Sequence, residues 1–350
     1  MNSEYLHHFK NKTVCFFSTV PRDKLQFENY SLQDIRILEE LGFKVVVVNT
    51  FSSIPLNCDL YFSWWASGSI LPLIKAALSL KPIIIVAGGN EAMLYRDSVS
   101  GKPAGYLNSS IWKKLATRFS LRFSTKVLVV SNFMLHDVRR LGARNPLVVH
   151  NCVNTEVYSP RTERGTFITS IFRLDRDTVI LKRGEIFIRS IAVVLKIYPS
   201  QQFLIIGRQG NDFERIQKLI LELNIDKNIK FVDEVANSEV VSWIQHSALY
   251  VQISDTETFG LAIAEAMSCE VPVLVSHRGA IPEVVGEAGI YVDHNLVDSV
   301  ANGLLYFLSM DRLQVDKIGR ILRARILSHY SYTKRKAKLF ELFKSVLVNE

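Results

Sequence analysis

Short runs of β-branched and aromatic residues alternate with longer amphipathic stretches along almost the whole chain. Six runs in the first half have the length and composition of strands: 13–19, 43–49, 60–65, 82–87, 126–131 and 146–150. Amphipathic helices are expected between them, at about 30–41, 68–80, 109–124 and 132–141. The valine and isoleucine runs are continuous rather than alternating with polar residues. This indicates strands buried on both faces, as in a parallel sheet.

The same pattern restarts after a polar segment at 154–165 that contains Pro160 and fits neither period. Expected strands follow at 166–172, 202–207, 229–234, 248–253, 271–276 and 289–292, with helices at about 183–197, 211–223, 237–246, 260–268 and 295–309. A basic helical stretch at 311–348 has no strand after it. The pattern predicts two successive doubly wound α/β domains. We expect them over 1–155 and 166–330, with a C-terminal helix over 331–350 that can pack back on the first domain.

The composition is that of a folded protein with an anionic partner. Of 350 residues, 48% are hydrophobic and 22% charged, which excludes a disordered chain or a fibre. The net charge of +8 favours phosphorylated small molecules, lipid surfaces or nucleic acid as partners. The four cysteines lie far apart without a C-x-x-C pair, as in a reducing compartment. No apolar run approaches the roughly 18 residues that span a bilayer. We therefore expect a cytoplasmic protein, either free or peripheral at the inner face of the membrane.

The segment 251–276 carries the clearest chemical signal. A strand ends near Ser254, Glu257 sits in the following turn, and Glu265 lies in the next helix, inside an otherwise apolar run. A helical spacing of eight residues covers about 12 Å, which is too far for a glycosidase-type carboxylate pair that acts on one bond. The spacing suits an elongated ligand held at two places. For either acid alone, the ordinary alternative is a helix-start acid or a solvated helix residue.

The backbone between these two acids is expected to bind phosphate. A helix that begins near Phe259 or Gly260 leaves its first amides without acceptors, at the positive end of the helix dipole. Such a terminus is a ready anion site. The amides concerned are those of Thr258, Phe259, Gly260 and Leu261.

Residues 257–267, Glu-Thr-Phe-Gly-Leu-Ala-Ile-Ala-Glu-Ala-Met, resemble the E-x7-E signature of group 1 glycosyltransferases, the retaining family 4 type with the GT-B fold. Residues 276–286 resemble the segment that follows this signature, and residues 129–131 and 151–154 resemble the strand end and domain crossing of that family. The resemblance implies two Rossmann-like domains that face each other across a cleft. It also implies hexosyl transfer from a nucleoside-diphosphate sugar to a glycan or lipid-linked acceptor, as in polysaccharide or glycolipid biosynthesis, with no cofactor and no metal.

The resemblance also implies roles for three residues of the second domain. Glu257 would be the catalytic residue, in contact with the transferred sugar near its reacting carbon, and Glu265 would bind the ribose hydroxyls of the nucleotide. Gly207, at the end of a strand, would let the nucleotide approach the backbone.

A basic pair grips the donor diphosphate in that family. The matching residues are Arg173, at the end of strand 166–172, and Lys182. The loop between them is longer than usual, so Arg183 is an alternative to Lys182. Fixed cations of this kind stabilise a departing nucleoside diphosphate without a metal.

The match in the first half is looser. Asn90 and Glu91 follow the fourth expected strand, where the family often places a His or Asp near the sugar, and they are candidates for the acceptor or sugar side. The first loop, 18–23, lacks the glycines that often help to hold phosphate.

Residues Asp175 to Asp177 form a D-x-D, the pattern that holds a divalent metal in the other large glycosyltransferase fold. Arg173 and Arg176 sit beside the two acids. We therefore expect a salt-bridged turn rather than a metal site.

Residues 112–126 hold five cations and no acid. Cations and apolar side chains each repeat every four residues on adjoining helix faces: Lys114, Arg118 and Arg122 beside Leu115, Phe119 and Phe123. Two interpretations are open. Either the helix lies on an anionic membrane surface, or its apolar face packs on the sheet while its cations are solvated.

Two functions besides sugar transfer remain alternatives. A non-catalytic nucleotide-sugar or phospholipid-binding protein of the same fold is favoured by the missing glycines at 18–23. Nucleic-acid binding is suggested only by the net charge, and because no recognised module accompanies it, we expect no nucleic-acid partner. The sequence also lacks G-x-G-x-x-G after its first strand and any G-x-x-x-x-G-K-[ST], which argues against a nicotinamide oxidoreductase and a P-loop nucleotidase.

Overall fold

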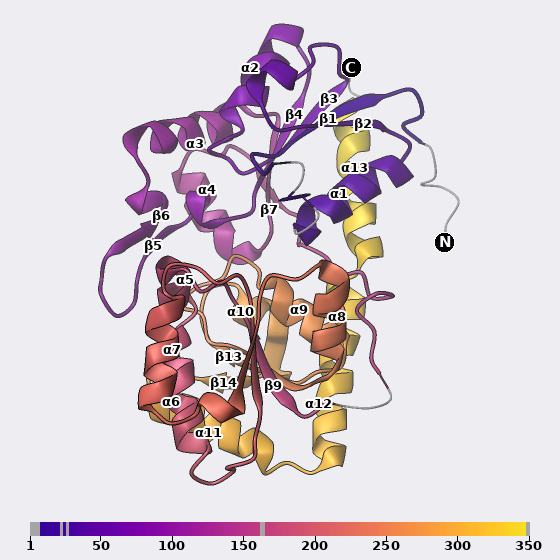
Figure 1. Cartoon of the computed structure of the whole chain (residues 1–350). Coiled ribbons are helices and arrows are strands. Elements are labelled where there is room, and N and C mark those ends of the chain that lie inside the picture. The colour runs from indigo at the N-terminus through magenta and orange to yellow at the C-terminus, as the bar shows by residue number, and fades with distance from the viewer. Residues whose placement is uncertain (1–7, 22–23, 26–27, 162–164, 348–350) are drawn as a thin grey trace. The chain divides into compact units, whose positions relative to one another are not determined.

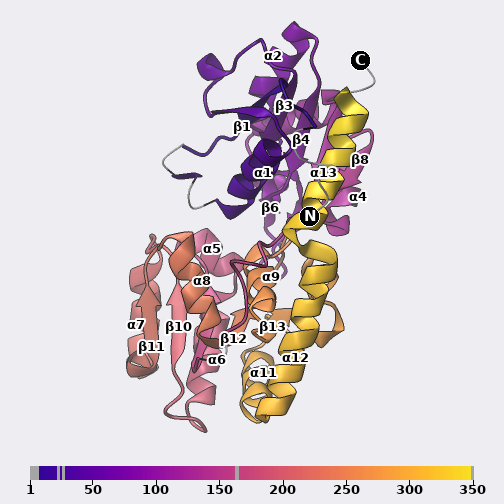
Figure 2. The same ribbon diagram turned by 90° about the vertical axis from the view of Figure 1, so that its right-hand side faces the viewer.

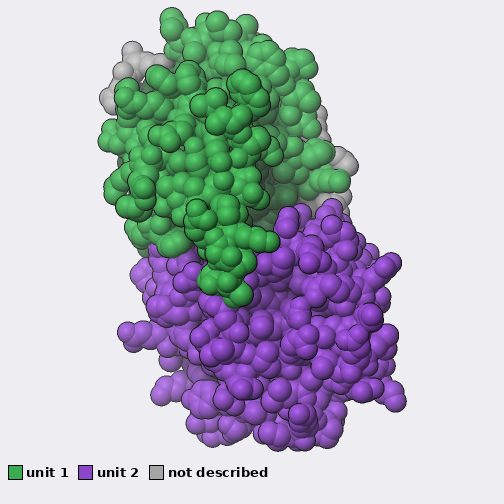
Figure 3. All heavy atoms as spheres, turned by 90° about the vertical axis from the view of Figure 1, so that its left-hand side faces the viewer, with its two compact units in different colours: residues 1–152, 332–350 green, residues 153–331 purple. Residues whose placement is uncertain are grey.

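The computed structural model describes residues 8–21, 24–25, 28–161 and 165–347. The chain divides into two compact units, coloured separately in Figure 3. Unit 1 comprises residues 1–152 and 332–350, and unit 2 comprises residues 153–331.

Unit 1 is built on a six-stranded, all-parallel sheet with the order β2-β1-β3-β4-β7-β8. Figure 1 labels β1 to β4 and β7 of this unit. Its strands are β1 Thr13–Phe17, β2 Lys44–Val48, β3 Leu60–Trp64, β4 Ile83–Ala87, β7 Lys126–Val129 and β8 Pro146–Val148. Its helices are α1 Asn29–Glu40, α2 Ile70–Ser79, α3 Ile111–Phe123, α4 Leu135–Arg140 and α13 Tyr332–Leu347. Strands β3 and β4 are buried at every position, which is why their sequences are continuous apolar runs.

Unit 2 repeats this architecture with the parallel strand order β11-β10-β9-β12-β13-β14. Its strands are β9 Phe167–Ile171, β10 Phe203–Ile206, β11 Ile229–Val232, β12 Ser247–Gln252, β13 Val273–Ser276 and β14 Ile290–Val292. Its helices are α5 Arg176–Leu181, α6 Gly184–Val194, α7 Phe213–Glu222, α8 Asn237–Gln245, α9 Leu261–Ser268, α10 Ile281–Val285, α11 Val297–Leu308 and α12 Arg312–Arg325. An apolar core that includes Phe187 from α6 and Phe203 from β10 lies between the sheet and the helices α5, α6, α7 and α11.

The predicted fold class, two parallel-sheet α/β domains with a C-terminal helical region, is confirmed. The twelve expected strands are all present, each within two residues of its expected ends. The sequence pattern does not indicate the antiparallel hairpin of β5 (Leu94–Arg96) and β6 (Pro103–Gly105), nor the short helices α5 and α10. Elements of three to six residues are too short to show a period.

The C-terminal stretch consists of two helices separated by a π-helical turn at Ile326–Tyr330. The second helix, α13, belongs to unit 1 (Figure 2). Its Arg335 is 3% exposed and donates to both carboxylate oxygens of Asp34 on α1, at 2.6 and 2.8 Å. A buried charge needs such a complete set of partners, so this pair fixes α13 against α1.

Candidate functional site

In unit 2 the carboxylate of Glu257 is the centre of a polar cluster in the turn after β12. Its Oε1 accepts hydrogen bonds from Lys182 Nζ at 2.5 Å, Gln252 Nε2 at 2.8 Å and Ser254 Oγ at 2.7 Å. The side chains of Lys182 and Glu257 are 19% and 15% exposed, so the ion pair is accessible from the surface of unit 2. Because all three donors meet the same oxygen, Oε2 is the atom that we expect a ligand to reach.

Tyr250 orients this cluster from within β12. Its hydroxyl donates to Oε1 of Gln252 at 2.7 Å, which turns the amide nitrogen of Gln252 toward Glu257. Burial raises the pKa of Tyr250, and the negative charges of Glu257 and Glu265 raise it further. Tyr250 therefore stays protonated and remains a donor.

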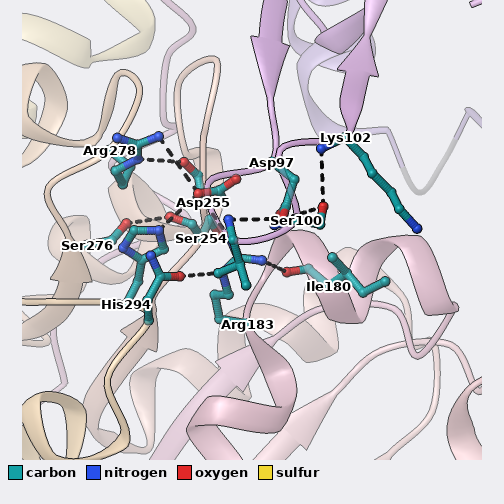
Figure 4. A network of polar contacts seen from close by, with 12 residues as sticks. Asp97, Ser100, Lys102, Ile180, Arg183, Ser254, Asp255, Ser276, Arg278 and His294 are labelled. Atoms are coloured by element: carbon teal, nitrogen blue, oxygen red, sulfur yellow. Dashed lines mark hydrogen bonds and ion pairs between the residues drawn. The ribbon is translucent and has the colours of Figure 1, made fainter. Parts of the chain in front are cut away.

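A buried ionic network holds the turn in place, as Figure 4 shows. Asp255, 1% exposed, forms an ion pair with Arg183 at 3.2 Å and contacts Nε2 of His294 at 2.9 Å. Its backbone amide donates to the carbonyl of Leu181 at 2.8 Å. These contacts tie the turn that carries Glu257 to the end of α5.

Lys182 and Arg183 are neighbours in sequence but have different surroundings. Lys182 reaches Glu257, whereas Arg183 is 6% exposed and also donates to Asn295 Oδ1 at 3.0 Å. The backbone of Arg183 has a φ of +53°, in the left-handed region, which allows the two side chains to diverge. Of the two cations that the sequence left open, Lys182 is the one beside Glu257.

Helix α9 begins one or two residues later than predicted. Gly260 is its N-cap, with a φ of +87°, and the first backbone bond runs from Ala264 N to Gly260 O at 3.1 Å. The first amides of the helix thus lie directly after the Glu257 cluster, where anions are favoured. Thr258 is half-buried, while Phe259 is 1% exposed and packs edge-on against Tyr330, so only its backbone can serve a ligand.

A tight contact with the next loop fixes this turn. A Cβ on Gly279, whose φ is +59°, would come within 2.5 Å of the backbone of Glu257. The amide of Ala280 also donates to the carbonyl of Glu257 at 2.9 Å. Glycine is needed here for both space and conformation.

Glu265 lies within α9 and is only 6% exposed. It forms a hydrogen bond with Tyr158, and burial together with this carboxylate raises the pKa of that tyrosine. The expectation of one helical spacing from Glu257 to Glu265 is wrong, because residues 257–260 form a turn and only the part from Leu261 is helical.

Arg173 and Asp175 follow β9. Arg173 is 59% exposed at its side chain, and its Nε lies 3.5 Å from Asp175 Oδ2. The same carboxylate oxygen accepts a bond from Arg208 at 3.1 Å. Asp177 lies in the first turn of α5. Within the described part of the chain, no group of three or more His, Cys, Asp or Glu side chains is arranged to hold a metal ion.

Gly207 directly follows β10, where the backbone just after β9 comes very close. A Cβ there would lie 2.2 Å from the carbonyl oxygen of Phe172, and the φ of Gly207 is +151°. The protein's own packing is therefore sufficient to require this glycine.

Asn90 and Glu91 lie in unit 1, in a short 3-10 helix, Asn90–Ala92, directly after β4. Oε1 of Glu91 accepts a bond from the amide of Ala66 at 3.2 Å, and the amides of Gly89 and Glu91 also contact this carboxylate. Burial of the carboxylate outweighs these bonds and raises the pKa of Glu91 to about 7.

Sequence reasoning missed the residues that position Glu257: Tyr250, Gln252, Ser254, Asp255 and His294. A usable signal was present, because Gln252, Ser254 and Asp255 are polar residues at and after the end of a mainly apolar strand. His294 follows another strand of the same sheet by two residues, and parallel strands end at a common edge.

Residues 169–321 match the family model described as "Glycosyl transferases group 1". Unit 2 carries a group 1 glycosyltransferase domain. The matched range of this domain contains Arg173, Lys182, Gly207, Glu257 and Glu265.

Curated relatives resemble the chain over part of their length. D-inositol 3-phosphate glycosyltransferase of Corynebacterium jeikeium is 29% identical over 143 residues, which cover 39% of this chain and 34% of the relative. The GPI3 subunit of phosphatidylinositol N-acetylglucosaminyltransferase from Saccharomyces cerevisiae is 23% identical over 246 residues, 67% of this chain and 51% of the relative. The chain thus spans between a third and about half of the length of these two relatives.

The fold of both units is shared with solved GT-B structures. Anabaena Alr3699/HepE, solved in complex with UDP and glucose, superposes with a TM-score of 0.76 over 96% of this chain and 100% of its own. Its sequence identity is 15%, so the likeness shows the fold alone. The chain has the GT-B fold. Among the described helices, none is both long enough and apolar enough to cross a bilayer.

Proposed function

We propose that the chain transfers a hexosyl group from a nucleoside-diphosphate sugar to a glycan or lipid-linked acceptor, with retention of anomeric configuration and without a metal ion. The observation that carries this proposal is the Lys182–Glu257 pair, which lies immediately before the N-terminus of α9. A cation, a carboxylate and the first amides of a helix meet there within the group 1 domain.

The cationic part of this site would hold the diphosphate. Arg173 has an exposed side chain, Lys182 is accessible, and the first amides of α9 add a fixed positive potential. In the reaction, the bond between the sugar C1 and the diphosphate oxygen breaks, and its electron pair stays on the diphosphate. These groups would stabilise that charge as it develops.

Glu257 would act on the transferred sugar, close to its reacting carbon C1. As C1 loses its leaving group it gains positive charge, and a carboxylate held in position by three donors can stabilise that charge. The acceptor oxygen would bond to C1 on the face that the diphosphate leaves, and its proton would pass to a departing phosphate oxygen. This step gives retention and needs no separate protein base.

The nucleoside and the acceptor would bind farther from the reacting carbon. Glu265 would meet the ribose by exchanging its bond to Tyr158 for the ribose hydroxyls. The UDP bound to Alr3699/HepE supports a nucleoside diphosphate as the ligand class. The name of the yeast relative includes phosphatidylinositol, which supports a lipid acceptor. Asn90 and Glu91 of unit 1 are the candidates for the acceptor or sugar side.

A thermal-shift panel of UDP-, GDP- and ADP-sugars tests the proposal first, because a ligand that binds only the folded state raises the unfolding midpoint. The sugars of one nucleotide should raise the unfolding midpoint, while those of the other two should hardly change it. In the presence of EDTA, the donor that binds should be hydrolysed or should transfer its sugar. A panel in which no donor binds would contradict the proposal. Binding without any turnover would favour the non-catalytic alternative.

A further inference from the structure

Helix α3 of unit 1 exposes its apolar side chains to solvent instead of burying them. Its buried positions are Thr117, Ser120 and Leu121. The apolar series on the other face is exposed: Leu115 by 51%, Phe119 by 51% and Phe123 by 56%, with Trp112 at 77%. The interpretation in which this apolar face packs on the sheet is therefore wrong.

The exposed apolar surface continues onto α2, which packs against α3 (Figure 1). Ile74 and Leu78 of α2 are 42% and 71% exposed. A groove of about 900 Å³ runs over these helices and is lined mainly by apolar side chains. We call this surface the α2–α3 face; it consists of Ile74, Leu78, Trp112, Leu115, Phe119 and Phe123. An apolar surface of this extent on a folded protein usually marks an interaction site.

The charged side chains that line this groove are both cations. Arg118 and Arg122 line the groove, and Lys113 is exposed beside it. Between Asp97 and Asp137 the sequence contains no acid. A partner must therefore bring negative charge to the rim and an apolar layer to the centre.

An anionic lipid bilayer has both of these properties. Phosphate groups would meet the arginines, while aromatic and aliphatic side chains would enter the boundary between headgroups and acyl chains. A second copy of the chain fits less well, because a two-fold interface would place the same cations against one another with no acid to pair them.

We propose that the α2–α3 face docks the protein onto an anionic lipid bilayer. Arg118 and Arg122 contact the lipid phosphates, and Trp112, Phe119 and Phe123 insert at headgroup depth. This docking is independent of the proposed sugar transfer, since vesicle binding needs neither donor nor acceptor.

The test is co-sedimentation of the full chain with phosphatidylcholine vesicles that contain either no or about one-third phosphatidylserine. Trp112→Ser/Phe119→Ser/Phe123→Ser should lower partitioning onto the anionic vesicles by about 30-fold or more, because most of the inserted apolar surface is lost. Arg118→Gln/Arg122→Gln should lower it about 30-fold, since each cation near such a surface contributes about 1 kcal/mol. Binding of the parent should weaken as salt is added.

Matched controls lie on α12 of unit 2, at Leu313→Ser and Arg320→Gln. Leu313 is 78% exposed and Arg320 is also exposed, so both controls remove accessible side chains from another surface. They should leave partitioning within about 2-fold of the parent. All variants should keep the parent's circular dichroism and melting midpoint, because the changed side chains are exposed.

Three results would overturn the proposal: absence of binding to anionic vesicles, equal binding with and without phosphatidylserine, or binding that the α2–α3 variants leave unchanged. Conversion of a dimer of the parent to a monomer in these variants would instead assign the face to a second copy. Emission from Trp112 gives an independent reading, because a blue shift on vesicles should disappear in Trp112→Ser alone.

Discussion

The two units share a sheet architecture but hold their candidate carboxylates in different ways. In unit 2, the carboxylate of Glu257 is held by side chains, including the ammonium group of Lys182 at 2.5 Å. In unit 1, Glu91 is held by backbone amides, including that of Ala66 at 3.2 Å. Both residues follow the carboxyl end of a central parallel strand.

This difference sets what each carboxylate can do. Gln252 and Ser254 are buried and hold the carboxylate of Glu257 in place, while Lys182 is accessible to an anionic ligand. The Glu91 carboxylate is held by backbone amides, and burial raises the pKa of Glu91 to about 7. Glu257 in unit 2 is thus suited to act as a fixed negative charge, and Glu91 in unit 1 as an acid that titrates near neutral pH.

The sharpest test of the fixed charge in unit 2 is Glu257→Gln. This variant keeps the size and most of the hydrogen bonds of the parent but removes the carboxylate charge. We expect kcat to fall by about 10²- to 10³-fold, with nucleotide affinity nearly unchanged. Steady-state kinetics and calorimetry with the donor found in the thermal-shift panel measure both quantities. Glu222→Gln on the surface of α7 is the control, and transfer at the parent rate by Glu257→Gln would remove Glu257 from the catalytic role.

Substitutions of the neighbouring cations Lys182 and Arg183 should have different effects, the first on ligand binding and the second on stability. Lys182→Ala should weaken diphosphate binding and slow transfer together, each by about 10- to 100-fold, since a charge-assisted bond is lost. Arg183→Ala should instead lower the free energy of unfolding by about 3 kcal/mol, because Asp255 is 1% exposed and loses the nearer of its two arginine partners. Calorimetry and urea denaturation measure these effects. A reversed pattern would assign the diphosphate to Arg183.

The titratable acid in unit 1 should make stability depend on pH. In the folded state the pKa of Glu91 is raised from 4.5 to about 7, so between these values the folded protein binds more protons than the unfolded chain. Its free energy of unfolding should therefore fall as pH rises through this range, by on the order of 3 kcal/mol. Glu91→Gln should lack this contribution.

The measurement is the difference in unfolding free energy between the parent and Glu91→Gln at several pH values. Taking the difference removes the opposite contributions of Glu185 and Asp212, whose pKa values are lowered by hydrogen bonds to Arg215. A difference that does not change between about pH 4.5 and 7 would show that the carboxylate of Glu91 is ionised in the folded protein.

The second acid of the E-x7-E segment should affect affinity more than rate. Glu265→Gln should weaken binding of the free nucleoside diphosphate by about 10-fold, because the ribose hydroxyls lose a charged acceptor. Tyr158→Phe is the matched control, since it removes the present partner of Glu265 but leaves the carboxylate for the ribose. Calorimetry that finds unchanged affinity in folded Glu265→Gln would exclude the ribose assignment.

The smallest effect is expected from metal removal. Diphosphate charge would be met by Arg173, Lys182 and the start of α9, so EDTA should change turnover by less than about 2-fold. Asp175→Asn/Asp177→Asn should have an equally small effect on turnover at saturating donor. Strict dependence on manganese or magnesium, lost in this double variant, would instead make the two aspartates metal ligands.

The sequence by itself determined the two parallel sheets and the position of Glu257 in a turn after a strand. Continuous apolar runs encode strands that are covered on both faces, and this information is local. The E-x7-E segment, residues 257–267, is also contiguous, so its resemblance to a family can be seen without a structure. The boundaries of α9 and the hairpin β5–β6 could be predicted less well from the sequence, because short elements show no period.

Only the tertiary structure decided which side chains meet. Lys182 and Glu257 are 75 positions apart and Arg335 and Asp34 are 301 apart, and no local pattern specifies such pairs. Strand order brings the first pair to one sheet edge, and the return of α13 to unit 1 creates the second. The same holds for the aromatic face of α3, because a helical repeat of apolar residues has the same sequence whether it is buried or exposed. What lies against a residue depends on chain segments far away in sequence, and that dependence is why burial and pairing required the fold.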